Sequence, residues 1–321
     1  MTTRANLIIL GLIALALIGL PFILKPYGIF VLSMWAVMSI AALGLNLTLG
    51  YAGQISLAQA SFFGIGAYTV ALLGPLGVPF PLAFLAGGIL CFLIGWVLGY
   101  PALRVQHHYL AFVTLAFTTL VFLVFRNEEW LTGGIYGVSG IKRPVFFGWS
   151  TTKAPDFYFF TLGMLALFSF FVWWMIRSPW GRAFIALREN PVRALSLGVD
   201  TRRYTLMAFA IGSALGGFAG GLYAPLVQFI EPNAFALGLS LNILLMVIVG
   251  GAGFFAGPFL GALISVLLPE WLRATEGFYL LAYAVLVMVL MAFCPTGLMG
   301  LVEKAGLALK RRTKLSEAKA P

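Results

Sequence analysis

A run of 78 residues without Asp, Glu, Lys, Arg or His, from 26 to 103, most limits what this chain can fold into. About 20 apolar residues already cross the hydrocarbon core of a bilayer, so the run cannot be one transmembrane helix. It must fold back on itself within the membrane. A polar, glycine-rich patch at 50–61 lies in the middle of the run. We therefore expect a polytopic membrane protein with hydrogen-bonding groups inside the bilayer, as in a permeation path.

The composition agrees with a membrane protein, because 61% of the 321 residues are hydrophobic and 9% are charged. The apolar stretches predict an all-α integral membrane protein with about ten transmembrane helices in a single domain, 1–321. The expected spans are 5–24, 28–49, 58–74, 80–100, 109–125, 157–176, 204–225, 239–252, 255–269 and 278–294.

The late uncharged stretch 232–269 holds 38 residues. One straight helix of that length would measure about 57 Å, nearly twice the hydrocarbon thickness. Glycines and a proline at 250–258 can end a helix and permit a reversal of the chain. We expect a broken segment there, either between two short crossings or as a re-entrant hairpin.

The distribution of Lys and Arg predicts the orientation. With the N-terminus in the cytoplasm, the inner segments hold 14 of the 20 basic residues, and an even number of spans places both termini inside. The net charge of +10 then reports membrane topology, and we expect no nucleic-acid partner. The basic tail, 295–321, is expected to contact anionic membrane lipid. The largest outer segment, 126–156, carries charges and aromatic residues that can dock a partner or simply remain solvated.

The inner segment 177–203 carries its own helix signals. We expect one short helix over 181–189. Asn190 can cap a second helix with Pro191 at its first position, and Gly198 can end that helix in a left-handed conformation. Such an element at a membrane surface is either a docking site for a partner or a plain interfacial amphipathic helix.

Five stretches together resemble the permeases of bacterial ABC importers for branched-chain amino acids, in their LivM-like branch. They are 45–68 (LNLTLGYAGQISLAQASFFGIGAY), 131–141 (LTGGIYGVSGI), 181–190 (GRAFIALREN), 194–198 (ALSLG) and 246–262 (MVIVGGAGFFAGPFLGA). The resemblance runs in register from about 40 to 300, most of the chain.

The resemblance implies an ABC importer permease fold in the bacterial inner membrane. The implied partners are a second related permease subunit, two ATP-binding subunits and a periplasmic substrate-binding protein. The segment 177–203 becomes the cytoplasmic coupling loop and 126–156 the periplasmic loop. The residues implied in ATPase coupling are Arg182, Arg188, Glu189, Arg193, Ala194, Leu195 and Gly198. The spacing from Glu189 to Gly198 departs from the general permease signature. Of that signature, this chain keeps only the interval from Ala194 to Gly198.

Uncharged amides and hydroxyls in a membrane either join helices or line a path. The candidates for the translocation path are Asn46, Gln54, Ser56, Gln59 and Ser61. Both interpretations stay open for each of them. The glycines at 216, 217, 220 and 221 are expected to pack helices closely, with a dimer seam as the alternative.

The chain has no G-x-x-x-x-G-K-[ST] motif, so we expect it to be no enzyme and to bind no cofactor, with ATP and Mg²⁺ on the partner subunits. No clustered ligands suggest a metal site. The alternative function is an ion-coupled secondary transporter of small polar solutes. No Asp or Glu falls in the core of an expected span, which argues against proton coupling. The sequence does not separate leucine, isoleucine and valine from urea or short amides as cargo.

Overall fold

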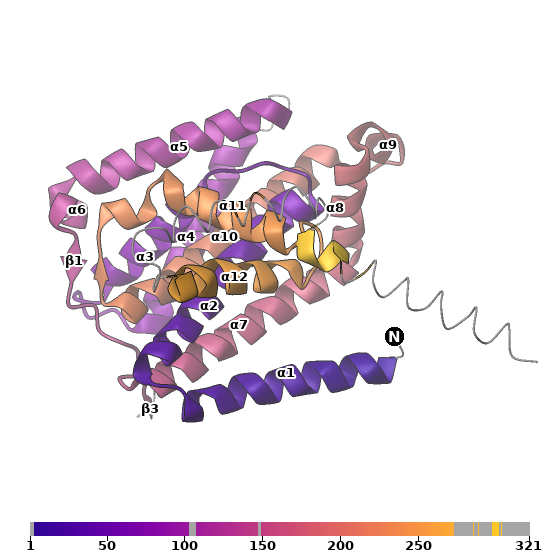
Figure 1. The fold of residues 1–321 in the computed structure, drawn as a ribbon. Coiled ribbons are helices and arrows are strands. Elements are labelled where there is room, and N and C mark those ends of the chain that lie inside the picture. Colours follow the sequence, from indigo (N-terminus) through magenta and orange to yellow (C-terminus); the bar gives the residue numbers. More distant parts are fainter. Residues whose placement is uncertain are drawn as a thin grey trace, which may run out of the picture.

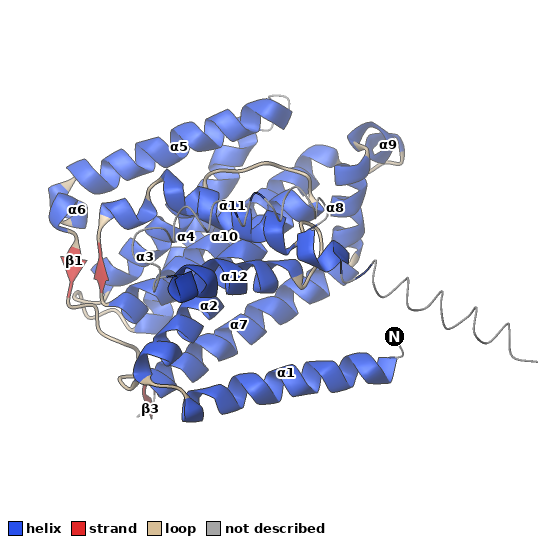
Figure 2. Cartoon of the chain, viewed as in Figure 1, coloured by secondary structure: helices blue, strands red, loops and turns tan. Residues whose placement is uncertain are grey.

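The structure, a computed structural model, describes residues 3–102, 107–146 and 149–272, together with 285, 288, 297–301 and 303. It is a bundle of long helices with two very short strand pairs (Figures 1 and 2). The long helices are α1 (Thr3–Ile23), α2 (Pro26–Leu45), α3 (Gln59–Leu73), α4 (Phe80–Ala102), α5 (His107–Asn127), α7 (Ala154–Arg177), α10 (Thr201–Val227), α11 (Leu237–Gly250) and α12 (Gly257–Leu272). The shorter helices are α6 (Glu129–Thr132), α8 (Pro179–Glu189) and α9 (Pro191–Ser196).

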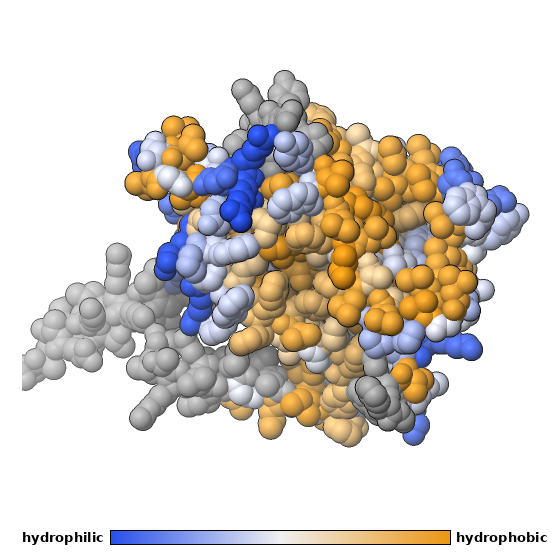
Figure 3. All heavy atoms as spheres, turned by 180° about the vertical axis from the view of Figure 1, so that it is seen from behind, coloured by the Kyte–Doolittle hydropathy of each residue, from blue (hydrophilic) through white to orange (hydrophobic). Residues whose placement is uncertain are grey.

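The first nine expected spans are confirmed as helices, and the tenth, 278–294, lies outside the residues that form described elements. Within the described part of the chain, five helices are long and apolar enough to cross a membrane, and α3, α11 and α12 are shorter apolar helices. Figure 3 shows hydrophobic side chains over the middle of one face and hydrophilic ones gathered toward two opposite sides. The chain is therefore a multi-pass, all-α membrane protein.

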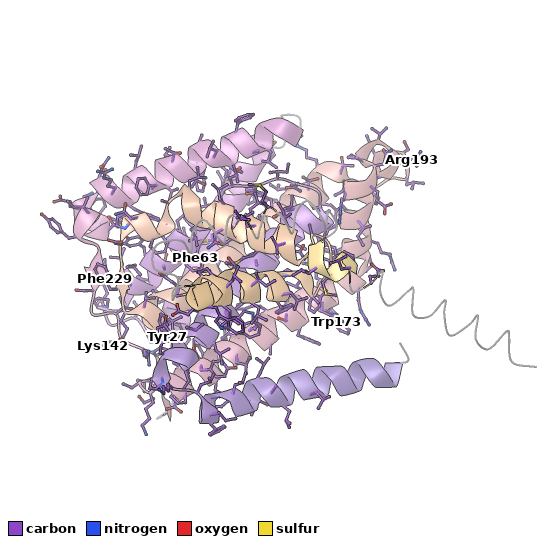
Figure 4. The ribbon with its side chains drawn as sticks, viewed as in Figure 1. Tyr27, Phe63, Lys142, Trp173, Arg193 and Phe229 are labelled. Carbon is purple, nitrogen blue, oxygen red and sulfur yellow. The ribbon has the colours of Figure 1, made fainter. Side chains whose placement is uncertain are left out.

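The bundle has two distinct ends (Figure 1). The described N-terminal part of α1 lies at the same end as α8 and α9, which we call the α8 end. The helix α6 and strands β1 (Val138–Ser139) and β3 (Trp149–Ser150) lie at the opposite end, the β1 end. In Figure 4, Arg193 marks the α8 end, and Lys142 and Phe229 mark the β1 end. The segments 177–203 and 126–156 therefore lie on opposite sides of the apolar belt.

Strand pairing in the segment 126–156 was not anticipated from the sequence. The strand β1 pairs with β4 (Phe229–Ile230), which directly follows α10, and β2 (Val145–Phe146) pairs with β3. The pairing of β1 with β4 ties the segment 126–156 to the end of the central helix. The described parts of this segment therefore include paired strands and lie at the β1 end.

The helix α10 lies at the centre and packs against α2, α3 and α4. A Cβ on Gly66 would overlap the backbone carbonyl of Gly217, and a Cβ on Gly220 would overlap that of Phe63. Backbone meets backbone where α3 crosses α10, as small residues permit in membrane bundles. The glycines of α10 therefore face helices of the same chain, so the alternative of a dimer seam at these glycines is wrong.

Two interruptions lie at the α8 end. The helix α2 continues into a π-helical turn, Asn46–Tyr51, and an irregular segment, 52–58, precedes α3. We call 52–58 the break segment. The expected break near 250–258 is confirmed, because α11 ends at Gly250 and α12 begins at Gly257, with Gly251 and Gly253 at φ 118° and 84°. Positive φ favours glycine, which explains why this reversal is glycine-rich.

We predict that G66A destabilises the folded chain while G163A, the same substitution on a lipid-facing part of α7, does not. An added methyl group at Gly66 meets a backbone carbonyl that cannot rotate away, whereas Gly163 has open space. Overpacking of this kind costs about 1–3 kcal/mol, and removing an exposed helix glycine gains up to about 1 kcal/mol. The measurement is the thermal midpoint in detergent, followed by size-exclusion chromatography. Equal midpoints for the two variants would contradict the backbone contact.

Candidate functional site

The α8 end presents a helical pair whose limits follow from local sequence. The Ser178 hydroxyl accepts a hydrogen bond from the Trp180 backbone N–H at 3.2 Å and so caps α8. The Asn190 side chain accepts from the Arg193 N–H at 3.0 Å and caps α9, with Pro191 in the first turn. Gly198 follows α9 at φ 81°. The two expected short helices are confirmed, as is the left-handed glycine after the second.

Arg188 joins this pair to the membrane bundle. Its Nη1 donates a hydrogen bond to the backbone carbonyl of Gly50, and the Arg188 guanidinium lies where a side chain on Gly253 would stand. A Cβ on Gly53 would lie 3.3–3.4 Å from the Cα, Cβ and Cγ atoms of Arg188, which is a tight contact. The side chain of Arg188 thus rests on two glycine loops, 50–53 and 250–253, which end α2 and α11. A glycine at Gly53 and Gly253 leaves the room that the arginine needs.

Asn46 ties the two glycine loops to each other. Its amide Nδ2 donates to the Phe254 carbonyl at 3.1 Å, and its Oδ1 accepts from the Gly253 N–H at 2.9 Å. Both polar ends of a buried amide are therefore satisfied by one backbone turn more than 200 residues away in sequence. Asn46, the two glycine loops and Arg188 form one unit, which we call the joint.

The residues assigned to coupling fall into two groups. Six of the seven are exposed, and Ala194 of α9 is buried; the exposed ones are Arg182, Arg188, Glu189, Arg193, Leu195 and Gly198. Three apolar side chains also stand free at this polar end, because Val192 is 73%, Leu195 62% and Leu197 83% exposed. Figure 3 shows hydrophobic atoms at the α8 end beside hydrophilic ones. Of the assigned residues, only Arg188 reaches the glycine loops.

The five candidates for the translocation path are all buried, and each of the three amides bonds to the backbone of another element. The Gln59 Nε2 donates to the Ala41 carbonyl at 3.0 Å and to the Gly212 carbonyl at 3.3 Å, which connects α3 with α2 and α10. The Ser56 hydroxyl accepts from the Ala58 N–H. The Gln54 Nε2 donates to the Thr205 carbonyl, but its Oε1 and the Ser61 hydroxyl have no hydrogen-bond partner among the described residues.

Sequence reasoning missed the residues that support the break segment. The Thr114 hydroxyl of α5 accepts from the Leu57 N–H at 3.0 Å, and the Thr118 hydroxyl donates to the Leu57 carbonyl at 2.8 Å. The Ser240 hydroxyl of α11 accepts from the Ala60 N–H at 2.9 Å, at the start of α3. The signal was present, since hydroxyls four residues apart on an apolar helix share one face.

The site has no visible metal chemistry within the described residues, where no three His, Cys, Asp or Glu side chains gather. The side chains of His107 and His108 and the whole of Cys294 lie outside the described part. Cys91 is buried between helices and its thiol points at the Phe62 carbonyl, 3.3 Å away. At the α8 end, exposed apolar and charged side chains thus lie on the same helical pair as Arg188, whose side chain contacts the two glycine loops.

Comparison with known proteins gives a consistent set of relatives. A family model described as "Branched-chain amino acid transport system / permease component" matches residues 27–294. The high-affinity branched-chain amino acid transport system permease protein LivM of Escherichia coli K12 is 32% identical, over 93% of this chain and 76% of that protein. A probable LivM of Methanocaldococcus jannaschii is 27% identical, over 71% and 76%.

A more distant relative is the autoinducer 2 import system permease protein LsrC of Escherichia coli O9:H4. It is 25% identical, over 68% of this chain and 61% of that protein. No solved structure matches the chain.

We predict that Q59L lowers the thermal midpoint, because it removes both hydrogen bonds that connect α3 with α2 and α10. The two carbonyls keep their helical bonds, so the cost is about 1 kcal/mol. The control is T119V, since Thr119 is on the surface of α5 and its hydroxyl bonds only to its own helix. An unchanged midpoint in Q59L would show that Gln59 does not act as interhelical glue.

Proposed function

The chain belongs to the family of permease components of branched-chain amino acid transport systems, and from this premise we propose that it carries branched-chain amino acids as a permease subunit of an ABC importer. The observation that carries the proposal is the family match over 27–294, together with 32% identity to LivM. Membership favours the importer over the ion-coupled transporter that the sequence alone left open. The chain acts as a transport subunit, not an enzyme.

The proposed assembly contains a second related permease subunit, two ATP-binding subunits and a periplasmic substrate-binding protein. The sequence supplies no phosphate-binding loop, so ATP and Mg²⁺ belong to the partners. The membrane is the bacterial inner membrane, with the α8 end and both termini in the cytoplasm. This orientation places the basic segments 177–203 and 295–321 on the inner side, as the distribution of Lys and Arg requires.

We assign two different tasks within the coupling loop. The exposed apolar and charged side chains of α8 and α9, including Arg193 and Leu195, dock on an ATP-binding subunit. Apolar groups that stand free at a polar end are typical of an interface. Arg188 instead passes the movement of α8 to the two glycine loops. The loops end α2 and α11, so a shift of α8 reaches two membrane helices at once.

For the translocation path we retain Gln54 and Ser61 as the strongest candidates. Each keeps a buried oxygen without a partner among the described residues, which a permeating solute or water can satisfy. Asn46 and Gln59 are better explained as ties, since their amides are already bound to backbone groups. Ser56 lies between them in the break segment.

The proposal is tested first on docking. We expect L195D to reduce co-purification of the ATP-binding subunits by about tenfold, which corresponds to about 1.4 kcal/mol, because a carboxylate replaces an exposed apolar contact. The matched control is I135D at the β1 end, where the same change is made on a side chain of similar exposure. The measurement is the ratio of subunits after affinity purification. Full co-purification of L195D would remove α9 from the interface.

A second test separates transmission from docking. We expect R188Q to keep the ATP-binding subunits bound but to lower ATP-driven leucine uptake into proteoliposomes by about tenfold, since it breaks the charged hydrogen bond to the Gly50 carbonyl. R203Q is the control: it removes the same charge at the same end, and the hydrogen bond described for Arg203 is that of its backbone N–H to Asp200. Normal uptake with R188Q would contradict the joint. Leucine uptake by the complete wild-type complex without ATP, driven by an ion gradient, would overturn the proposed function itself.

A further inference from the structure

A cavity of about 500 Å³ lies at the β1 end, on the side away from the joint. Its walls come from the last turn of α3, the turn 74–79, the start of α4 and the segment 139–145. These parts surround the space from three directions. Its volume falls within the range of about 300–1,000 Å³ that is usual for small-molecule sites.

The floor of the cavity is apolar. It is formed by buried side chains from three elements: Val70 and Ala71 of α3, Ala83 of α4, and Ile141 of the outer segment. None of these carries a hydrogen-bonding side chain, so the floor can accept only the hydrocarbon part of a ligand. The rim differs, because it contains the two adjacent cations Lys142 and Arg143.

Arg143 has unused hydrogen-bonding capacity. Its Nη1 donates to the Thr152 carbonyl at 2.9 Å and its guanidinium lies 5.2 Å from the centre of the Phe157 ring. Its Nε–H is buried and has no acceptor within the described part of the chain. Among the described residues no carboxylate forms an ion pair with Arg143, and burial lowers the pKa of its guanidinium. As a half-buried cation that lines the cavity, Arg143 can bind an anion through the Nη N–H groups that Thr152 does not use.

The opposite wall carries the opposite partial charge. The helix α3 ends at Leu73, beside the cavity, and its last carbonyls form the negative end of the helix dipole. The Val70 carbonyl accepts from the Gly74 N–H, yet a carbonyl oxygen has a second lone pair. An ammonium group is favoured there. The cavity thus offers a cationic rim, a weakly anionic wall and an apolar floor.

We propose that this cavity is a binding site for a free α-amino acid with a branched apolar side chain. The carboxylate binds Lys142 and Arg143, the ammonium lies at the end of α3, and the hydrocarbon contacts Val70 and Ala83. This rests on the proposed function, and it adds that the permease itself recognises the cargo at the β1 end. A simple anion would need only the cationic rim. An amino acid also uses the end of α3 and the apolar floor.

The test is equilibrium binding of radiolabelled leucine to the purified complex in nanodiscs of phosphatidylcholine, without the binding protein. We expect saturable binding that the double variant K142Q/R143Q weakens by about tenfold or more, as expected for lost charged hydrogen bonds. V145W adds bulk at the exposed rim and is expected to weaken binding equally. K153Q removes a charge from the same outer segment without lining the cavity and is expected to change binding less than twofold.

Two leucine analogues examine the charge pattern. Because the rim binds the carboxylate, 3-methylbutylamine, which lacks it, should compete at least about tenfold more weakly than leucine. 4-Methylpentanoate, which keeps the carboxylate but lacks the ammonium, should compete better than the amine. Competition by the amine equal to that of leucine would overturn the assignment of the rim.

Other occupants give different results. If the cations hold a lipid phosphate, K142Q/R143Q will carry less phosphatidylglycerol through purification from the cell membrane and will keep leucine binding in the nanodiscs, which overturns the proposal. If they hold a carboxylate of the binding protein, the variant will lose docking of that protein and keep leucine binding, which also overturns it. A wild-type complex that imports leucine but shows no saturable binding would overturn this site alone. A complete wild-type complex that does not import leucine would overturn the proposed function.

Discussion

The structure depends on how an irregular backbone is satisfied inside an apolar bundle. The break segment separates the π-helical turn after α2 from the start of α3. Lipid cannot supply hydrogen bonds there, so each free N–H or C=O has to find a partner within the protein. Both backbone groups of Leu57 are bonded by threonines of α5. The next helix begins where Ser240 of α11 accepts from its first turn. Loss of these side chains would leave the backbone unsatisfied, and α3 could not start where it does.

The same requirement explains the joint. A π-helical turn and a glycine reversal end two helices at the same level, and their backbones are exposed to each other. Asn46 satisfies one carbonyl and one N–H of the reversal at once. Arg188 then satisfies Gly50 from outside the bundle. Through Arg188, the surface helix α8 therefore takes part in the internal hydrogen bonding of the membrane domain and contacts both glycine loops.

Much of this could be predicted because its causes are local. Long apolar runs produce the helices, and Asn190, Pro191 and Gly198 set the limits of α9 through their own backbone and side-chain chemistry. The sequence also indicated that polar groups gather at 50–61. It could not separate glue from path, because an amide has the same chemistry in both. Gln59 is assigned to helix packing only because the structure places the carbonyls of Ala41 and Gly212 within hydrogen-bond distance of its amide.

The remaining features depend on contacts that are distant in sequence. The pairing of β1 with β4 joins residues about 90 positions apart, and two-residue strands leave no periodic signal. Arg188 was grouped with the docking residues because it lies among them in sequence. Its separate role follows from the glycine loops that its guanidinium meets. The glycine spacing predicted close packing of α10. The identity of the helices that pack there, such as α3, is known only from the fold.

The helix α3 connects the two functional ends. It begins at the break segment and ends at the cavity, a distance of about 22 Å for 15 residues. Its backbone packs directly against that of α10 at Gly66 and Gly220, where an added Cβ would overlap a backbone carbonyl of the other helix. We expect a movement imposed at the joint to be carried by α3 and α10 together, because close-packed interiors transmit strain rather than absorb it. The wall of the cavity moves with that pair, while the cationic rim belongs to the outer segment. Coupling between the two ends then amounts to a change in the distance between the end of α3 and Arg143, so that a ligand bound across both would favour one arrangement of the joint over the other.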